Sequence, residues 1–313
     1  MHHQPLRPTA SSKIKRRLTP LAFGATCVAS LFALTPAIRA DDAPSRVHAL
    51  VNLEFADKYL TPRGMIVQQH GATMQTLFLA FVDVYHGGSD DFLNGVTLIP
   101  GFWNDFATSP IPKHLSGAGG GTDWVEYDPI LGIEVAFAKS FKLDVTYTEF
   151  GMQILDIGTS QHLETKLAYD DSAALGAMAL HPYITYWKEL TNKATAASNF
   201  GAPSSYYWEV GVAPGWKSGG IDFSLPIRAL LPNKNFYGEK FAKSSTVALY
   251  EFGIKLSSSA TFMPAGYGHW SYHLGYKYMS FVDDNLKQLS TSGGFGAKTS
   301  GTGQIYAGLS SFF

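Results

Sequence analysis

One stretch of the chain decides its fold class: Phe141-Lys142-Leu143-Asp144-Val145-Thr146-Tyr147-Thr148. Apolar and polar side chains alternate through it without a break. Because successive side chains of a β-strand point to opposite faces, the alternation predicts a strand with one apolar face and one charged or polar face.

The same alternation returns along much of the chain. Val51, Leu53, Phe55 and Tyr59 form one apolar row, and further rows run through residues 163–169, 248–256 and 270–278. The segment from Leu77 to Val84 is an exception, because it is apolar on both faces until Asp83. With the turn signals between the runs, the pattern predicts a β-rich chain.

Twelve candidate strands follow from these runs. They lie at residues 46–59, 74–86, 92–106, 124–138, 141–153, 161–170, 181–190, 204–216, 221–231, 245–257, 268–281 and 303–313. Several connections are short, at 87–91, 139–140 and 217–220, while those at 107–123, 191–203, 232–244 and 282–302 are long. The Gly-rich segment within 107–123 is interpreted as a loop rather than a linker between domains.

Two architectures contain such strands: a soluble sandwich, whose apolar faces meet, and an outer-membrane barrel, whose apolar faces contact lipid. The alternating loop lengths, the Tyr, Trp and Phe side chains in the apolar rows, and the terminal Phe313 all favour the barrel. We expect an all-β fold, a transmembrane antiparallel up-and-down β-barrel of about 12 strands with short periplasmic turns and long extracellular loops.

The N-terminus has the parts of a secretory signal peptide. Residues 1–17 carry five basic side chains and no acid, an apolar stretch follows from Leu21 to Leu34, and Asp41-Asp42 begins a polar region. A transmembrane helix needs about 20 apolar residues, which is more than this stretch provides. We expect a signal peptide at 1–40, cleaved after Ala40, and one barrel domain at 41–313 exported to the outer membrane of a Gram-negative cell.

Composition excludes several kinds of site. The only cysteine, Cys27, lies within the expected signal, so disulfides and cysteine-based metal sites are not expected in the mature chain. Six of the 24 Lys and Arg residues and none of the 25 acids precede Asp41, which leaves 18 basic and 25 acidic side chains and a formal charge of −7. This acidic balance argues against a nucleic-acid partner.

Short motifs suggest a family. Tyr59-Leu60-Thr61-Pro62-Arg63-Gly64 follows the first strand, and Asp128-Pro129-Ile130-Leu131-Gly132 opens the fourth. With Leu163-Glu164, Asp170-Asp171 and Pro182-Tyr183, they resemble uncharacterised Gram-negative outer-membrane β-barrel families that carry an aromatic residue and then Arg-Gly after the first strand. The resemblance implies fold and location, and it implies no catalytic residue or substrate.

Charged and polar side chains on the inward faces are the candidate functional residues. They are expected to line the barrel interior, and they are Glu54, Glu134, Lys142, Asp144, Glu164, Lys166, Glu209, Glu251, Lys255, His273 and Lys277. Charges of both signs either line a water-filled pore or pair and plug a narrow barrel, and the sequence leaves both open. We expect a porin-like passive channel for small polar solutes, with a non-conducting structural or adhesive barrel as the alternative.

An outer-membrane phospholipase-type enzyme is the less favoured alternative. Such an enzyme needs a Ser and a His held together near the membrane interface, but no His-x-Ser-x-Gly sequence occurs here. His70-Gly71, His86-Gly87 and His114-Leu115-Ser116 are interpreted as turn or loop residues. We expect no catalytic residue, cofactor or metal. The expected partners are outer-membrane lipid, small polar solutes, and the barrel-assembly machinery, which would bind the strand ending at Phe313.

The expected signal peptide gives a first prediction. Protein recovered from the outer membrane should begin near Asp41, because signal peptidase removes the basic and apolar segment during export. N-terminal sequencing measures this directly. Membrane-inserted protein that still began at Met1 would contradict it.

Overall fold

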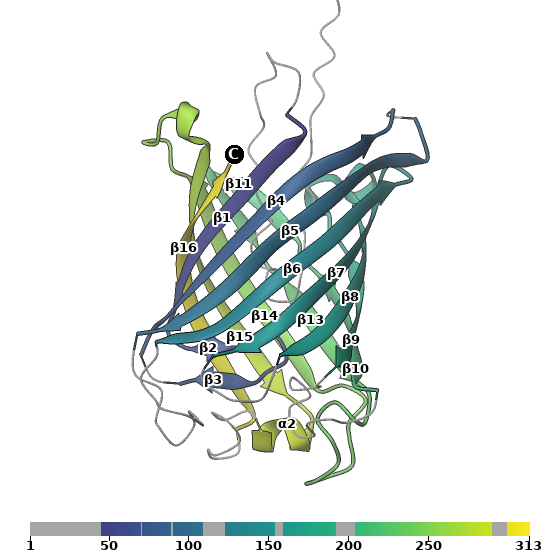
Figure 1. Ribbon diagram of the computed structural model, residues 1–313, viewed down its shortest axis with the longest axis vertical. Coiled ribbons are helices and arrows are strands. Elements are labelled where there is room, and N and C mark those ends of the chain that lie inside the picture. Colours follow the sequence, from purple (N-terminus) through teal and green to yellow (C-terminus); the bar gives the residue numbers. More distant parts are fainter. Residues whose placement is uncertain are drawn as a thin grey trace, which may run out of the picture.

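The computed structural model describes residues 45–69, 71–88, 90–108, 123–153, 159–191, 204–289 and 299–313. The expected signal peptide at 1–40, His70, His114-Leu115-Ser116 and most of the 107–123 loop lie outside these ranges. Within them, twelve long strands close into one antiparallel barrel (Figure 1). This confirms the predicted fold class.

The strands of the wall follow one another around the barrel in chain order. They are β1 (Val47–Ala56), β4 (Thr73–His86), β5 (Leu93–Ala107), β6 (Trp124–Phe137), β7 (Phe141–Met152), β8 (Ser160–Tyr169), β9 (Tyr183–Thr191), β10 (Tyr206–Val212), β13 (Ile227–Pro232), β14 (Leu249–Ser259), β15 (His269–Phe281) and β16 (Gly301–Phe312). Each strand pairs with the next, and β16 pairs with β1 to close the sheet. The ring of these twelve strands therefore has no unpaired edge.

Two predicted strands are divided by proline. The predicted strand 204–216 becomes β10 and β11 (Gly215–Ser218), with Pro214 between them, and 221–231 becomes β12 (Ile221–Ser224) and β13, with Pro226 between them. Proline lacks the amide hydrogen that a sheet requires, so the ladder is interrupted there. The β11–β12 hairpin continues the wall, because β12 pairs with β14.

The two faces of the wall differ in polarity as the alternation predicts. On β14, Tyr250, Phe252 and Ile254 are exposed on the outside, whereas Leu249 and Lys255 are buried on the inside. On β15, Tyr272, Leu274, Tyr276 and Tyr278 repeat the exposed apolar row. A belt of exposed Tyr, Leu, Ile and Phe around a closed barrel is the surface that a lipid bilayer covers.

The two ends of the barrel carry different connections. We call the end near the C-terminus the terminal end, and it has the turns at 87–92 and 138–140 (Figure 1). We call the opposite end the loop end, and it has the long connections. The terminal-end connection between β8 and β9 contains α1 (Ser172–Leu175) and η1 (Gly176–Met178). At the same end, η2 (Ala265–Tyr267) precedes β15. Neither α1 nor α2 (Asp284–Leu289), the α-helices of the described ranges, is long enough to cross a membrane.

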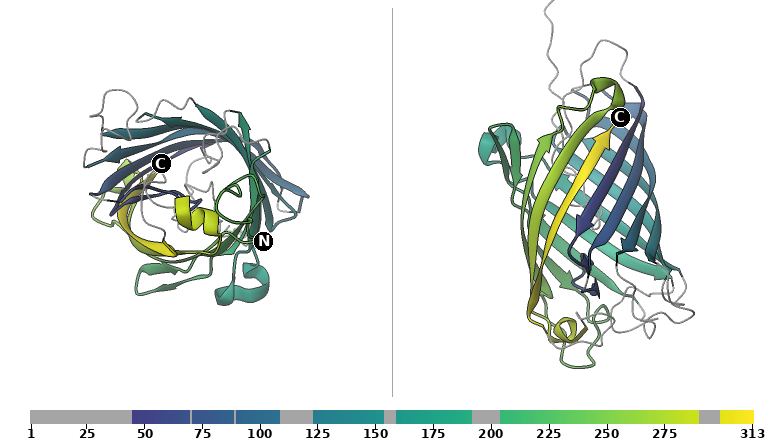
Figure 2. Two further views of the ribbon diagram at one scale, coloured as in Figure 1. Left: turned by 90° about the horizontal axis from the view of Figure 1, so that it is seen from below. Right: turned by 90° about the vertical axis from the view of Figure 1, so that its left-hand side faces the viewer.

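A short hairpin fills part of the loop end. β2 (Tyr59–Leu60) and β3 (Ile66–Gln68) lie within the outline of the barrel in Figure 1, and the view from below in Figure 2 places α2 across the same opening. We call residues 57–68 the plug hairpin. The sequence places Tyr59 in the outward apolar row, but this is wrong: the chain leaves the wall after Ala56, and Tyr59 is buried inside.

Apolar packing holds the plug hairpin. Leu60 and Ile66 from the hairpin pack with Phe236 and Leu286, and the wall contributes Trp187, Tyr207, Leu230, Leu249, Met279 and Phe281. At its tip, Gly64 has a φ of +83°, and a Cβ there would lie 2.9 Å from Phe281 Cε1. The tip therefore needs glycine for its backbone conformation and for the close contact with the wall.

The polarity of the wall predicts a stability difference at Leu274, which is exposed at the middle of β15. Leu274→Arg should lower the free energy of unfolding in lipid vesicles by about 2 to 4 kcal/mol, because it places a charge in hydrocarbon. Leu274→Met, the matched control, should change it little. Denaturant titration measures both, and equal costs for Arg and Met would mean that Leu274 does not face lipid.

Candidate functional site

The predicted interior residues all lie on inward-facing rows of their strands. Eight of the eleven are buried: Glu54, Glu134, Asp144, Glu164, Lys166, Glu209, Lys255 and His273. Lys142, Glu251 and Lys277 are half-buried. Because the outward rows of the wall are exposed, these charges face the barrel interior. Whether they line a conducting path stays a prediction.

One set of charges spans β6, β7 and β8. Lys142 Nζ lies 3.0 Å from Glu134 Oε1. Asp144, two residues along β7, interacts electrostatically with both Lys142 and Lys166. Lys166 in turn lies near Glu164 and Glu209, with its Nζ 4.2 Å from the centre of the Tyr183 ring. Charges of opposite sign are therefore neighbours across these three strands.

The set continues on β9, β10, β13 and β14 through an arginine. The Tyr183 hydroxyl donates a 2.9 Å hydrogen bond to Glu209 Oε1. The Arg228 guanidinium pairs with the Glu209 carboxylate and, at 2.7 Å, with Glu251 Oε2. Lys277 on β15 also interacts with Glu251. Arg228 is the buried cation that joins the carboxylates of two wall strands.

The last members lie on β14, β15 and β1. His273 Nε2 lies 3.1 Å from Glu54 Oε2, and Lys255 interacts electrostatically with the same carboxylate. The eleven predicted residues, with Arg228 and Tyr183, thus form an interior band of both signs. We call this set the charge belt.

Polar contacts anchor the tip of the plug hairpin to the wall and to the connection between β13 and β14. Arg228 Nη2 donates a 2.7 Å hydrogen bond to the Pro62 carbonyl, and the Tyr237 hydroxyl donates one of 2.7 Å to the Arg63 carbonyl. Burial, with the neighbouring Tyr207, raises the pKa of Tyr237 well above its ordinary range, so this phenol stays a neutral donor. The same Arg228 that joins the charge belt therefore also holds the hairpin.

The opposite side of the hairpin meets an acidic wall. The Tyr59 hydroxyl donates a hydrogen bond to Glu126. The Arg63 guanidinium lies 5.3 Å from the centre of the Trp187 ring and interacts electrostatically with Glu126 and Asp128. All of these side chains are buried. The hairpin is thus held at its tip and along its side.

Sequence reasoning missed several of these residues. Glu126 and Asp128 have the same parity as Glu134 on one predicted strand, and Arg228 alternates with apolar neighbours on another, so alternation could have found all three. No local signal shows that Arg63 turns into the interior. Its position depends on contacts with segments far away in the chain.

A second polar cluster lies in the connection between β8 and β9 at the terminal end. Ligand atoms of Asp170, Asp171 and His181 lie within 4.8 Å of one another. The Asp171 carboxylate accepts hydrogen bonds from the backbone amides of Leu180 and His181. Burial opposes the charged form, but these bonds outweigh it and hold the pKa of Asp171 below its ordinary value. These hydrogen bonds give Asp171 a structural role, which is to stabilise the connection between β8 and β9.

The architecture is that of an outer-membrane β-barrel: a closed antiparallel wall, an apolar outer belt and a polar interior. No protein-family model matches the sequence, and no curated protein is similar to it in sequence. The expected family with the Tyr59 to Gly64 motif therefore stays a prediction.

Solved structures with a related form include channels and an autotransporter. An outer membrane channel from Pseudomonas putida F1 is 11% identical, with 89% of this chain and 100% of that chain covered and a TM-score of 0.46. The NanC porin is 9% identical, with 83% and 98% covered and a TM-score of 0.44. The translocator domain of the autotransporter NalP from Neisseria meningitidis is 10% identical, with 87% and 90% covered and a TM-score of 0.41. Structural similarity at this level does not distinguish a channel from an autotransporter translocator.

The position of Arg228 gives a stability prediction. Arg228→Met should lower the free energy of unfolding by about 3 to 5 kcal/mol, because it removes the buried cation that pairs with both Glu209 and Glu251. Adding Glu209→Gln and Glu251→Gln to the same protein should recover most of the loss. Denaturant unfolding in vesicles compares the two. A triple variant no more stable than Arg228→Met would show that the ion pairs are not the cause.

Proposed function

We propose that the protein is a passive outer-membrane channel for small polar solutes, closed at its loop end in this structure by the plug hairpin. The observation that carries the proposal is the charge belt. Buried ion pairs are often no more stabilising than apolar side chains of similar volume, so a barrel that is only structural has no need of charges on eight of its strands. A path for polar solutes does need a polar interior.

Hydrogen-bonding capacity in the interior supports the same function. Asp105 Oδ2, Asp144 Oδ1 and His162 Nε2 are buried atoms that form no hydrogen bond with another group of the described chain. Buried polar atoms are generally satisfied by protein or by water. An interior of this kind favours hydration, and hydration is what a polar solute requires along its path.

The plug hairpin explains how such a channel could be closed. Its tip is fixed by two hydrogen bonds to carbonyl oxygens, from Arg228 to Pro62 and from Tyr237 to Arg63. The hairpin is held mainly by side-chain contacts, whereas each wall strand is held by backbone pairing along its length. Displacing the hairpin therefore costs less than opening the wall, and the hairpin is the part that we propose moves.

The remaining assignments belong to the same proposal. We infer export by a cleaved signal peptide, contact with outer-membrane lipid, and recognition by the barrel-assembly machinery through the strand that ends at Phe313. We assign no catalytic step, cofactor or nucleic-acid partner to the chain.

Single-channel recording in a planar bilayer tests the function. Replacing residues 58–68 with a short Gly-Ser linker should raise conductance well above that of the wild-type protein, because it removes the plug hairpin from the interior. Replacing residues 261–267, at the terminal end, with a similar linker is the matched control and should leave conductance at the wild-type level.

Ion selectivity tests the role of the charge belt in the same recordings. In the protein without the plug hairpin, Lys166→Glu with Lys255→Glu should shift the reversal potential toward cation selectivity, since the belt then carries mostly negative charge. Lys139→Glu, in a turn outside the belt, should not. A protein that remained non-conducting without its hairpin would overturn the channel function and favour the structural or adhesive barrel.

A further inference from the structure

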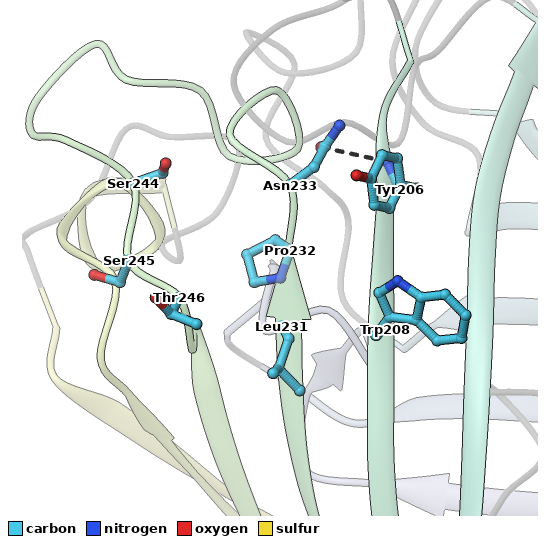
Figure 3. Close-up of a pocket in the computed structure, with 8 residues that line it drawn as sticks. All are labelled: Tyr206, Trp208, Leu231, Pro232, Asn233, Ser244, Ser245 and Thr246. Atoms are coloured by element: carbon cyan, nitrogen blue, oxygen red, sulfur yellow. Dashed lines mark hydrogen bonds between the residues drawn. The ribbon is translucent and has the colours of Figure 1, made fainter.

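A groove of about 390 Å³ lies on the outside of the barrel at the loop end. Figure 3 shows Tyr206 and Trp208 of β10 on one side of it, Ser244, Ser245 and Thr246 on the other, and Leu231 of β13 between them. Trp208 is 44% exposed, whereas its neighbour Tyr207 is fully buried in the interior. The groove therefore opens on the face that contacts lipid and is separate from the charge belt.

The groove exists because two wall strands separate. β13 and β14 are paired from Ile227 and Phe252 to Leu230 and Leu249, and the pairing ends there. Pro232 has no amide hydrogen to extend the ladder. The Ser245 amide instead donates a 2.6 Å hydrogen bond to Asp283 Oδ2, which draws residues 244–246 toward β15. The opening is thus fixed by a buried carboxylate on the other side of the segment.

The groove is lined by aromatic and apolar side chains on one side and by hydroxyl-bearing side chains on the other. Tyr206 and Trp208 contact Tyr186 of β9, with ring centres 5.6 and 4.8 Å from it, and Leu231 extends this apolar side. The other side carries the hydroxyls of Ser244, Ser245 and Thr246. Aromatic side chains beside hydroxyl groups are typical of the boundary between hydrocarbon and headgroups.

Several basic residues are next to lining residues of the groove in the chain or in strand register. Lys234 and Lys243 are exposed, and each directly adjoins a lining residue in the chain, Asn233 or Ser244. Residues 233–246 contain three Lys and one Glu. That acid, Glu239, accepts hydrogen bonds from the amide and hydroxyl of Ser244, both at 3.2 Å, and interacts electrostatically with Lys234 and Lys243, so the charge of these residues together is positive. Lys188 of β9 adds a further cation, since it pairs in register with Tyr206.

We propose that this groove binds an anionic phospholipid of the surrounding membrane leaflet, one whose headgroup carries phosphate and a net negative charge. The acyl chain lies against Trp208 and Leu231. The phosphate meets Lys188, Lys234 and Lys243 and the hydroxyls of Ser245 and Thr246. Charge complementarity selects an anionic headgroup, and the lipid-facing position supplies the chain from the bilayer. This binding does not depend on whether the barrel conducts.

Native mass spectrometry of the full chain in a neutral detergent tests the proposal, with phosphatidylglycerol and phosphatidylcholine as probes. The wild-type protein should retain phosphatidylglycerol in preference to phosphatidylcholine. Lys234→Gln with Lys243→Gln should weaken phosphatidylglycerol binding by roughly tenfold or more. Lys139→Gln with Lys217→Gln removes two exposed lysines at the terminal end and is the matched control, which should bind as the wild type does.

A second arm distinguishes a lipid from a free anion. Trp208→Ala should weaken phosphatidylglycerol binding, because the acyl chain loses its main contact, and inorganic phosphate at the same concentration should not displace the lipid. Equal retention of both lipids, equal losses in the two double-lysine variants, or displacement by inorganic phosphate would each overturn the proposal. Thermal unfolding of each variant, recorded beside the binding data, should match the wild type, so that a loss of binding is not a loss of fold.

Discussion

Backbone amide and carbonyl groups cannot be left unpaired in hydrocarbon, and this constraint governs the rest of the structure. Pairing of β1 with β16 closes the ring of twelve strands, and only then can the outward rows be apolar along their whole length. Where pairing stops, at Leu230 and Leu249 near the loop end, the wall forms a groove instead of continuing the ladder.

Closure of the wall also creates an interior space that the chain has to fill. A twelve-stranded barrel is wider than side chains of the wall alone readily fill. This chain fills part of the space with charges of both signs and part with the plug hairpin, and Arg228 belongs to both because it contacts Glu209, Glu251 and the Pro62 carbonyl. A change at Arg228 is therefore expected to affect the stability of the wall and the position of the hairpin together.

Alternation predicts the wall strands because side-chain polarity with a period of two is local information, as residues 141–148 illustrate. It predicts which charges face inward for the same reason. It fails at Tyr59, because an alternating segment looks the same in the wall and in a hairpin folded inside it. The hairpin is positioned by Arg228, 166 residues from Pro62, and by Tyr237, 174 residues from Arg63. Such distant contacts depend on the completed barrel and leave no local pattern.

Spin labels on β14 test the central claim most directly, because the mature chain is expected to contain no cysteine of its own. Single cysteines placed in turn from Leu249 to Ser259 would carry the label in lipid vesicles. The structure predicts that labels at even positions, such as Tyr250, Phe252 and Ile254, collide readily with oxygen dissolved in lipid, while those at odd positions do not. Accessibility without this period of two, or with the odd positions in lipid, would contradict the barrel as described.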